Sequence, residues 1–142
     1  MAMERSHVLS IVSVAVATCF LTGRPAQAAS KTIVNAGQAF YMQYCAKCHG
    51  AEGKGDGPAA KTQQTPPSDL TQLAKKNGGK FPYMEVLDIL DGETPFPGHG
   101  SSEMPKWGQT FQGDVGSSQG GEEATRLKLM EVTDFLRSIQ QK

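Results

Sequence analysis

Two cysteines and a histidine are the residues of this chain best suited to chemistry. Cys45 and Cys48 are separated by two residues, and His49 follows the second cysteine directly. One helical turn brings both sulfurs to the same side of the backbone, where each can add to a porphyrin vinyl group. The imidazole that follows can then bind the iron as an axial ligand. The pattern predicts covalent haem attachment at Cys45 and Cys48, with His49 as an iron ligand.

The same three residues also suit a disulfide, a redox-active dithiol or half of a zinc site. A zinc site needs four protein ligands, or three and a water, and the sequence has no second cysteine pair or suitably spaced histidine pair. A thioredoxin-like dithiol lies near a βαβ pattern, which the sequence lacks. Export to an oxidising compartment would favour a disulfide, but haem attachment uses both thiols.

The first 28 residues have the features of a cleaved secretory signal peptide. Arg5 stands in a short polar start, residues 8–21 form an apolar run, and Ala26-Gln27-Ala28 supplies the small residues before a cleavage site. The run is short for a membrane span, so an uncleaved anchor is the alternative. The sequence predicts cleavage after Ala28 and export to the periplasm.

Cys19 ends a segment, residues 16–19, that is similar to a bacterial lipoprotein box. Such boxes usually carry Gly, Ala or Ser before the cysteine, and Thr18 departs from that pattern. Lipid anchoring at Cys19 is therefore a minor alternative, which a mature chain that starts at Ala29 would exclude.

Residues 29–142 are expected to form one small domain of 114 residues. Of the 14 basic and 14 acidic residues, Arg5, Arg24 and Glu4 leave with the signal, so 12 and 13 remain. This near-neutral balance argues against a nucleic-acid-binding protein, which usually has a strongly basic face. A domain this small has a limited core, to which a porphyrin adds apolar surface. We therefore expect the haem-free chain to be largely unfolded.

The periodic segments indicate helices, and strand-like alternation is nearly absent, so the predicted fold class is all-α. Helices are expected over residues 35–45, 82–91 and 122–140, with a short helical turn over 71–76. Asn35 suits an N-cap, and Gly92 suits the left-handed position after a helix. The expected buried stripes are Val86, Ile89 and Leu90 in the second helix and Leu129, Val132, Leu136 and Ile139 in the last, with Phe135 beside them. Residues 108–121 are rich in Gly, Ser and Gln, which indicates a mobile surface loop.

The order of these features resembles the class I c-type cytochromes over most of residues 33–140, and most of all their small secreted bacterial members. Gly37 and Tyr41 precede the cysteines at the offsets at which those proteins cross their N- and C-terminal helices. Phe135-Leu136 matches the aromatic-Leu pair near their C-terminus, and residues 65–70, Thr-Pro-Pro-Ser-Asp-Leu, are similar to the segment on the histidine side of the haem. The resemblance implies the cytochrome c fold, in which crossed N- and C-terminal helices and a middle helix surround one covalently attached haem.

The resemblance also implies a second axial ligand. Met104-Pro105 resembles the family's Met-Pro, so Met104 is the expected ligand opposite His49. A His/Met pair raises the reduction potential relative to His/His. Among the other sulfurs, Met84 is not excluded by spacing, whereas Met42 and Met130 are expected to be core or packing residues. His99, between two glycines, is the rival ligand, although a histidine in such a loop is more often exposed to solvent.

Three further expectations concern the surroundings of the haem. A backbone carbonyl of Pro66 or Pro67 would accept a hydrogen bond from the His49 Nδ1–H, unless both prolines only shape the loop. Trp107 would either donate its indole N–H to a haem propionate or pack along the haem edge. Lysines near that edge could steer an acidic partner, although acidic neighbours dilute their charge. These residues are Lys47, Lys54, Lys61 and Lys106, diluted by Glu52, Asp56 and Glu103.

The expected function is periplasmic electron transfer by one covalently bound haem c that cycles between Fe(II) and Fe(III), and the protein is expected not to be an enzyme. Its partners would be redox proteins, such as a periplasmic dehydrogenase, a bc1-type complex or a terminal oxidase. No nucleic acid and no stable membrane insertion are expected, and the protein would be a monomer. The alternatives are a haem enzyme or a sensor with a labile sixth iron ligand, or, within electron transfer, a dedicated subunit of a larger complex.

Overall fold

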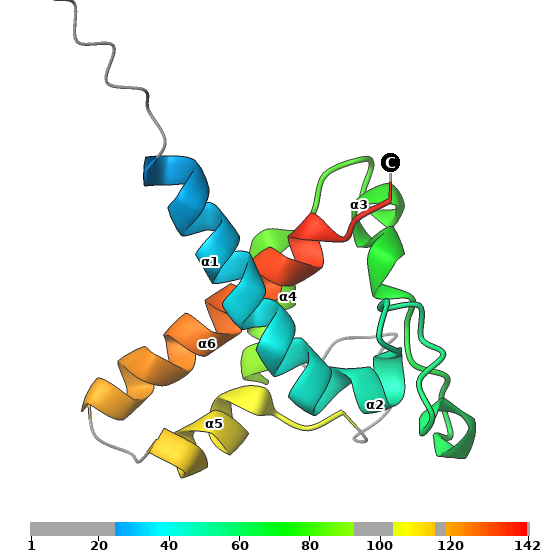
Figure 1. The fold of residues 1–142 in the computed structure, drawn as a ribbon. Coiled ribbons are helices and arrows are strands. Elements are labelled where there is room, and N and C mark those ends of the chain that lie inside the picture. The colour runs from blue at the N-terminus through cyan, green and yellow to red at the C-terminus, as the bar shows by residue number, and fades with distance from the viewer. Residues whose placement is uncertain (1–24, 93–103, 116–118, 142) are drawn as a thin grey trace, which may run out of the picture.

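The computed structural model of the chain describes residues 25–92, 104–115 and 119–141. Within these ranges it contains helices, turns and loops but no strand, which confirms the all-α prediction (Figure 1). The elements in chain order are α1 (Pro25–Phe40), η1 (Tyr41–Cys45), α2 (Ala46–His49), η2 (Ala60–Thr62), η3 (Leu70–Gln72), α3 (Leu73–Lys76), α4 (Tyr83–Asp91), α5 (Trp107–Val115) and α6 (Gln119–Ser138).

The first and last long helices cross, as Figure 1 shows, and Gly37 allows them to approach closely. A Cβ atom at Gly37 would lie 1.9 Å from the backbone oxygen of Glu131, so no larger residue fits without moving one helix. Beside this point the rings of Tyr41 and Phe135 pack with their centroids 5.0 Å apart. The crossing expected from Gly37, Tyr41 and Phe135 is confirmed.

Helix α1 begins ten residues earlier than the predicted Asn35. The added segment, residues 25–34, contains alanines at positions 26, 28 and 29, which have the highest helix propensity of any residue. Pro25 stands at the first helical position, where its missing N–H breaks no bond. Asn35 is therefore an interior residue and not a cap. The predicted cleavage site lies in the first turn of this helix, and cleavage stays a prediction, as does the domain of residues 29–142.

The middle and last helices match their predictions closely. Helix α4 is followed by Gly92 at φ +84°, the left-handed conformation expected there. The expected turn over residues 71–76 is present as η3 and α3. Helix α6 begins three residues before the predicted Glu122 and ends two before Gln140. The buried hydrophobic side chains of α4 and α6 are Val86, Leu87, Leu90, Leu129, Val132, Phe135 and Leu136, whereas Ile89 and Ile139 are half-buried.

The prediction of a loop over residues 108–121 is wrong, because α5 occupies its first half. Gly108 and Gly113 lower the helix propensity of α5, but Phe111 is only 2% exposed. Burial of that ring against the helices nearby outweighs the weak local preference.

No helix in the described part of the chain combines the length and apolar character needed to cross a membrane. The predicted signal segment up to residue 24, including Cys19, lies outside the described residues.

Candidate functional site

The two cysteines and the histidine follow directly from α1 through a change of helical type. Residues 41–45 form the π-helical turn η1, in which the Ala46 N–H donates to the Tyr41 carbonyl five residues earlier. Such a turn holds one more residue than an α-helical turn, so it rotates the side chains that follow it, and π turns are frequent at functional sites. Cys45 ends this turn, and Cys48 and His49 lie in the single turn of α2.

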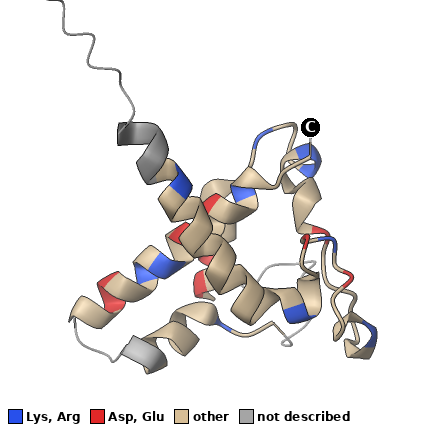
Figure 2. Ribbon diagram, in the orientation of Figure 1, with Lys and Arg blue, Asp and Glu red and all other residues tan. Residues whose placement is uncertain are grey.

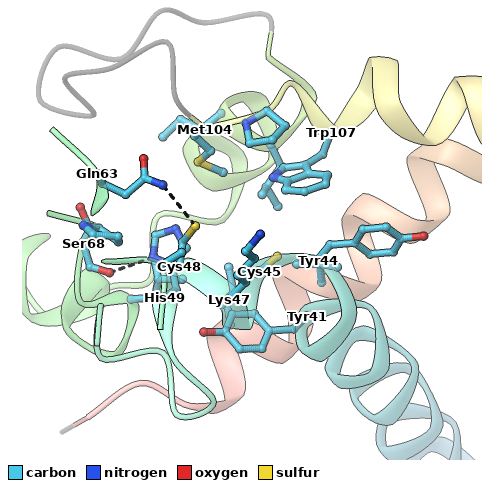
Figure 3. A pocket seen from close by; sticks show the side chains of 18 of the residues that line it. Tyr41, Tyr44, Cys45, Lys47, Cys48, His49, Gln63, Ser68, Met104 and Trp107 are labelled. Carbon is cyan, nitrogen blue, oxygen red and sulfur yellow. Dashed lines mark hydrogen bonds between the residues drawn. The ribbon is translucent and has the colours of Figure 1, made fainter. Parts of the chain in front are cut away.

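These residues line a cavity of about 490 Å³, a size typical of ligand sites. Figure 3 shows both cysteines and His49 on one side and Met104 across from them. The remaining wall is largely apolar and comes from segments far apart in the sequence. Its main apolar residues are Leu70, Leu73, Val86, Leu90, Val132 and Leu136.

His49 is held by a hydrogen bond to the loop that follows the η2 turn. Its Nδ1 lies 3.0 Å from the backbone oxygen of Ser68, and the side chain is buried. A carbonyl oxygen can only accept, so Nδ1 must carry the proton, and Nε2 is the nitrogen with a lone pair for a metal. This is the state that a haem-binding histidine needs.

The expectation that Pro66 or Pro67 accepts this bond is wrong. A Cβ atom at Gly55 would lie 2.3 Å from the Pro67 oxygen, so that carbonyl faces the Gly55 backbone. The next carbonyl, that of Ser68, accepts the bond from His49.

The buried tyrosine at the helix crossing fixes the other flank of His49. The Tyr41 hydroxyl donates to the Gly50 carbonyl at 2.6 Å, directly after the histidine. Burial raises the pKa of the Tyr41 hydroxyl well above its usual value of 10.0, and the nearby Cys45 and Asp56 raise it further. The hydroxyl therefore keeps its proton and remains a donor at physiological pH.

Met104 is the one methionine of the described ranges that lines the cavity. Met84 is 60% exposed and does not line it. The interpretation of Met42 and Met130 as core or packing residues is wrong, because they are 48% and 38% exposed. The rival His99, and Glu103, lie outside the described residues.

Trp107 follows Met104 at the start of α5 and packs among other rings. Its centroid lies 5.6 Å from that of Tyr44 and 5.8 Å from that of Phe111, and Tyr44 and Trp107 both line the cavity. The ring therefore packs at the wall of the cavity, and both expectations, a bond to a propionate and packing along the haem edge, stay predictions. Tyr44 and Phe111 were not foreseen, because Phe111 lies in the supposed loop and no spacing rule pointed to Tyr44.

The environment of the thiols differs from that of a redox-active dithiol. Burial, and then the nearby Cys48, raise the pKa of the Cys45 thiol from 9.0 to about 12. Catalytic dithiols depend on a cysteine whose pKa is lowered, so that a thiolate attacks at neutral pH. Both cysteines are free of a disulfide.

Gln63 is a further cavity residue that sequence reasoning missed. Its side-chain nitrogen lies 3.8 Å from the sulfur of Cys48, to which it donates a weak hydrogen bond (Figure 3). No periodic pattern marks Gln63, because it stands in an irregular segment after η2.

Basic and acidic residues are interspersed along the described elements (Figure 2). Lys47, Lys61 and Lys106 are exposed, and Lys47 also lines the cavity. Lys54 forms an ion pair with Glu52, which lowers the pKa of that carboxyl. Glu52 therefore offsets the positive charge of Lys54, as expected.

A comparison with protein families gives further evidence on the class of this site. The family described as cytochrome C oxidase, cbb3-type, subunit III matches residues 33–91, which include both cysteines, His49 and helix α4. Residues 33–91 are therefore similar to a c-type cytochrome domain. No curated protein and no solved structure matched the chain.

A cytochrome c domain implies covalently bound haem c, and the residues of this chain fit that group. Two thiols lie at the wall of one largely apolar cavity, beside an imidazole whose tautomer leaves Nε2 able to bind a metal. A thioether sulfur from Met104 lines the same cavity.

Proposed function

We propose that this protein is a periplasmic electron carrier with one haem, which Cys45 and Cys48 would hold by thioether bonds and whose iron His49 and Met104 would bind. The observation that carries this proposal is the convergence of these four side chains on one apolar cavity. When bound, the haem supplies a one-electron Fe(II)/Fe(III) couple.

The protein's part in this function is to hold two ligands and exclude water. The bond from Nδ1 to Ser68 fixes the direction of the His49 ring and increases its basicity as a ligand. Met104 provides a soft thioether, which favours the ferrous state. The apolar walls would exclude water from the bound group.

A redox titration of the purified holoprotein tests this proposal. We expect a reversible one-electron titration and a low-spin spectrum in both states, with no rapid reaction with peroxide and no tight binding of carbon monoxide. A haem enzyme would turn over peroxide, and a sensor would bind carbon monoxide tightly, because each needs a labile sixth ligand. Either result would contradict the carrier proposal.

A second candidate is a dedicated subunit of a terminal oxidase, favoured by the matching family, which is described as an oxidase subunit. A free carrier elutes alone when the tagged protein is isolated from solubilised membranes at moderate salt. A dedicated subunit co-purifies with oxidase subunits in fixed stoichiometry.

The periplasmic location rests on the signal peptide proposed for residues 1–28. Intact mass of the exported protein tests it. We expect a chain that starts at Ala29, whereas a lipidated chain that starts at Cys19 would contradict the proposed cleavage.

A further inference from the structure

The loop that carries the hydrogen-bond acceptor of His49 is tied to the end of the chain. Ser68 lies two residues before Leu70, which begins the short helix η3. The chain leaves α6 at Ser138 and continues to residues 140 and 141, which return to η3 and the start of α3. Four hydrogen bonds join these two segments, about 70 residues apart in sequence.

The side-chain amide of Gln140 makes three hydrogen bonds. Its nitrogen donates to the carbonyl of Leu70 at 2.7 Å and to that of Leu136 at 2.7 Å. Its oxygen accepts from the Ala74 N–H at 2.8 Å. Only this orientation satisfies all three groups, because a reversed amide would set its oxygen against two carbonyls.

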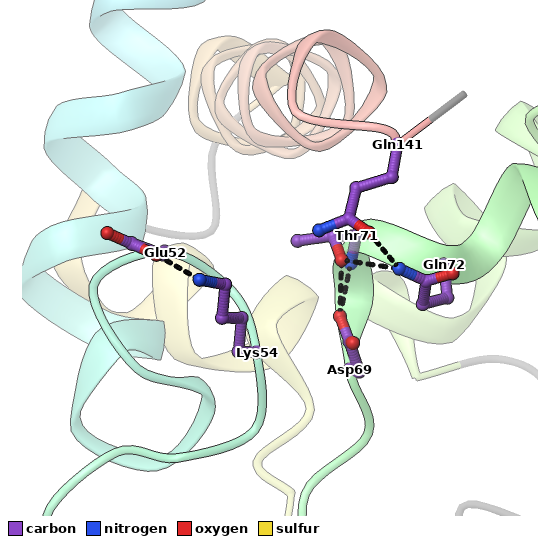
Figure 4. A network of polar contacts seen from close by, with 6 residues as sticks. All are labelled: Glu52, Lys54, Asp69, Thr71, Gln72 and Gln141. Carbon is purple, nitrogen blue, oxygen red and sulfur yellow. Dashed lines mark hydrogen bonds and ion pairs between the residues drawn. The ribbon is translucent and has the colours of Figure 1, made fainter.

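The neighbouring residue adds a backbone bond to the same segment. The Gln141 N–H donates to the Thr71 carbonyl at 2.9 Å, and the Gln141 side chain accepts from Gln72 (Figure 4). On the other side of η3, Asp69 accepts from the Thr71 N–H and hydroxyl. The segment after Ser68 is thus held at several points, and Gln140 provides the bonds to both η3 and α3.

We propose that Gln140 is a positioning residue for His49. By fixing Leu70 and Ala74 it holds the Ser68 carbonyl at hydrogen-bonding distance from Nδ1, and so sets the orientation and basicity of the histidine. This inference rests on the proposed function, in which His49 binds the haem iron. The orientation and basicity of His49 would then depend on a residue that lies 91 positions later in the chain.

The test compares Gln140→Met with Gln141→Met in the holoprotein. Methionine at 140 has a similar length and no charge, but it removes all three bonds of the amide. Methionine at 141 removes only the contact with Gln72 and leaves the backbone bond to Thr71 intact. The readouts are hydrogen exchange of the His49 Nδ1–H by NMR and the reduction potential.

We expect Gln140→Met to speed exchange of the Nδ1 proton about tenfold or more. It should also raise the equilibrium constant for reduction about threefold, or about 28 mV at 59 mV per factor of ten, because a looser bond makes the imidazole a weaker donor. Gln141→Met should leave both quantities unchanged. Exchange and potential as in the wild type for Gln140→Met would overturn the inference.

If Gln140→Met fails to fold, Gln140→Glu takes its place in the exchange experiment. Glutamate can still accept from the Ala74 N–H, but it sets a carboxylate oxygen against the Leu70 and Leu136 carbonyls in place of the two donated bonds. Faster exchange is therefore expected, and unchanged exchange overturns the inference. Wild-type protein without the spectrum of a covalent haem would instead refute the proposed function. The two failures are therefore distinguishable.

Discussion

At the scale of single residues, a few side chains and one backbone carbonyl determine which atoms of the site can bind a metal. The three residues Cys45, Cys48 and His49 could be predicted from sequence, because their chemistry depends on spacing within one helical turn. The Ser68 carbonyl could not, because a backbone acceptor has no sequence signature and its direction depends on how Pro67 packs against Gly55. Gln63 and Tyr44 were not predicted for a similar reason, because only the tertiary structure brings them to the cavity.

Replacement of Met104 by leucine tests the proposed second ligand. We expect the weak near-red band of sulfur-to-iron ligation to disappear from the oxidised spectrum. The reduction potential should fall by about 100 mV or more, within the roughly 0.8 V that axial ligands span. Met84→Leu is the matched control, because Met84 is exposed and outside the cavity. A Met104→Leu protein with an unchanged band and potential would show that another group binds the iron.

Asp69 gives a prediction for the dependence of stability on pH. The hydrogen bond from the Thr71 side chain is the main reason that the pKa of this carboxyl lies below its usual value. The unfolded carboxyl protonates near pH ~4 and the folded one at lower pH, so its stabilisation is present above about pH 4 and lost below it. Asp69→Ala should therefore lower the free energy of unfolding by about 1 kcal/mol at pH 7.

Urea unfolding of the holoprotein at several pH values measures this effect. The difference between Asp69→Ala and the wild type should shrink as the pH falls from about 5 to about 2. A difference that stays constant over this range would mean that the carboxylate charge has no part in capping η3.

Among the elements, the crossing of α1 and α6 depends on the smallest side chain at its centre. Gly37→Ala would push a methyl group against the Glu131 backbone, at a cost of about 1–3 kcal/mol in the free energy of unfolding. Gly113→Ala is the matched control, because no atom lies within 4 Å of a Cβ atom there, and alanine should stabilise α5 by about 0.5–1 kcal/mol. Equal effects of the two substitutions in thermal or urea unfolding would contradict the close approach of the helices.

The elements differ in how far their sequences determine them. Helices α4 and α6 were predicted because their apolar residues recur at helical spacing. Helix α5 was missed because its stability comes from one buried ring, Phe111, and not from local propensity. The early start of α1 was missed because Asn35 suits a cap, although the alanines before it continue the helix.

At the scale of the whole molecule, the cavity separates the elements that surround it. Without a haem, the apolar walls contributed by α4, α6 and η3 would face water or collapse on one another. We expect Cys45→Ser/Cys48→Ser protein, prepared without haem, to be largely unfolded, with weak helical circular dichroism and no cooperative thermal transition. A helical spectrum like that of the holoprotein, with a cooperative melt, would contradict this expectation.

The covalent link between chain and haem is tested most directly by the intact mass of the exported protein after denaturation in acid and organic solvent. We predict that every molecule retains the mass of one haem beyond that of the polypeptide and that neither Cys45 nor Cys48 reacts with a thiol reagent. A mass equal to that of the polypeptide alone, with both thiols reactive, would contradict the assignment of this site.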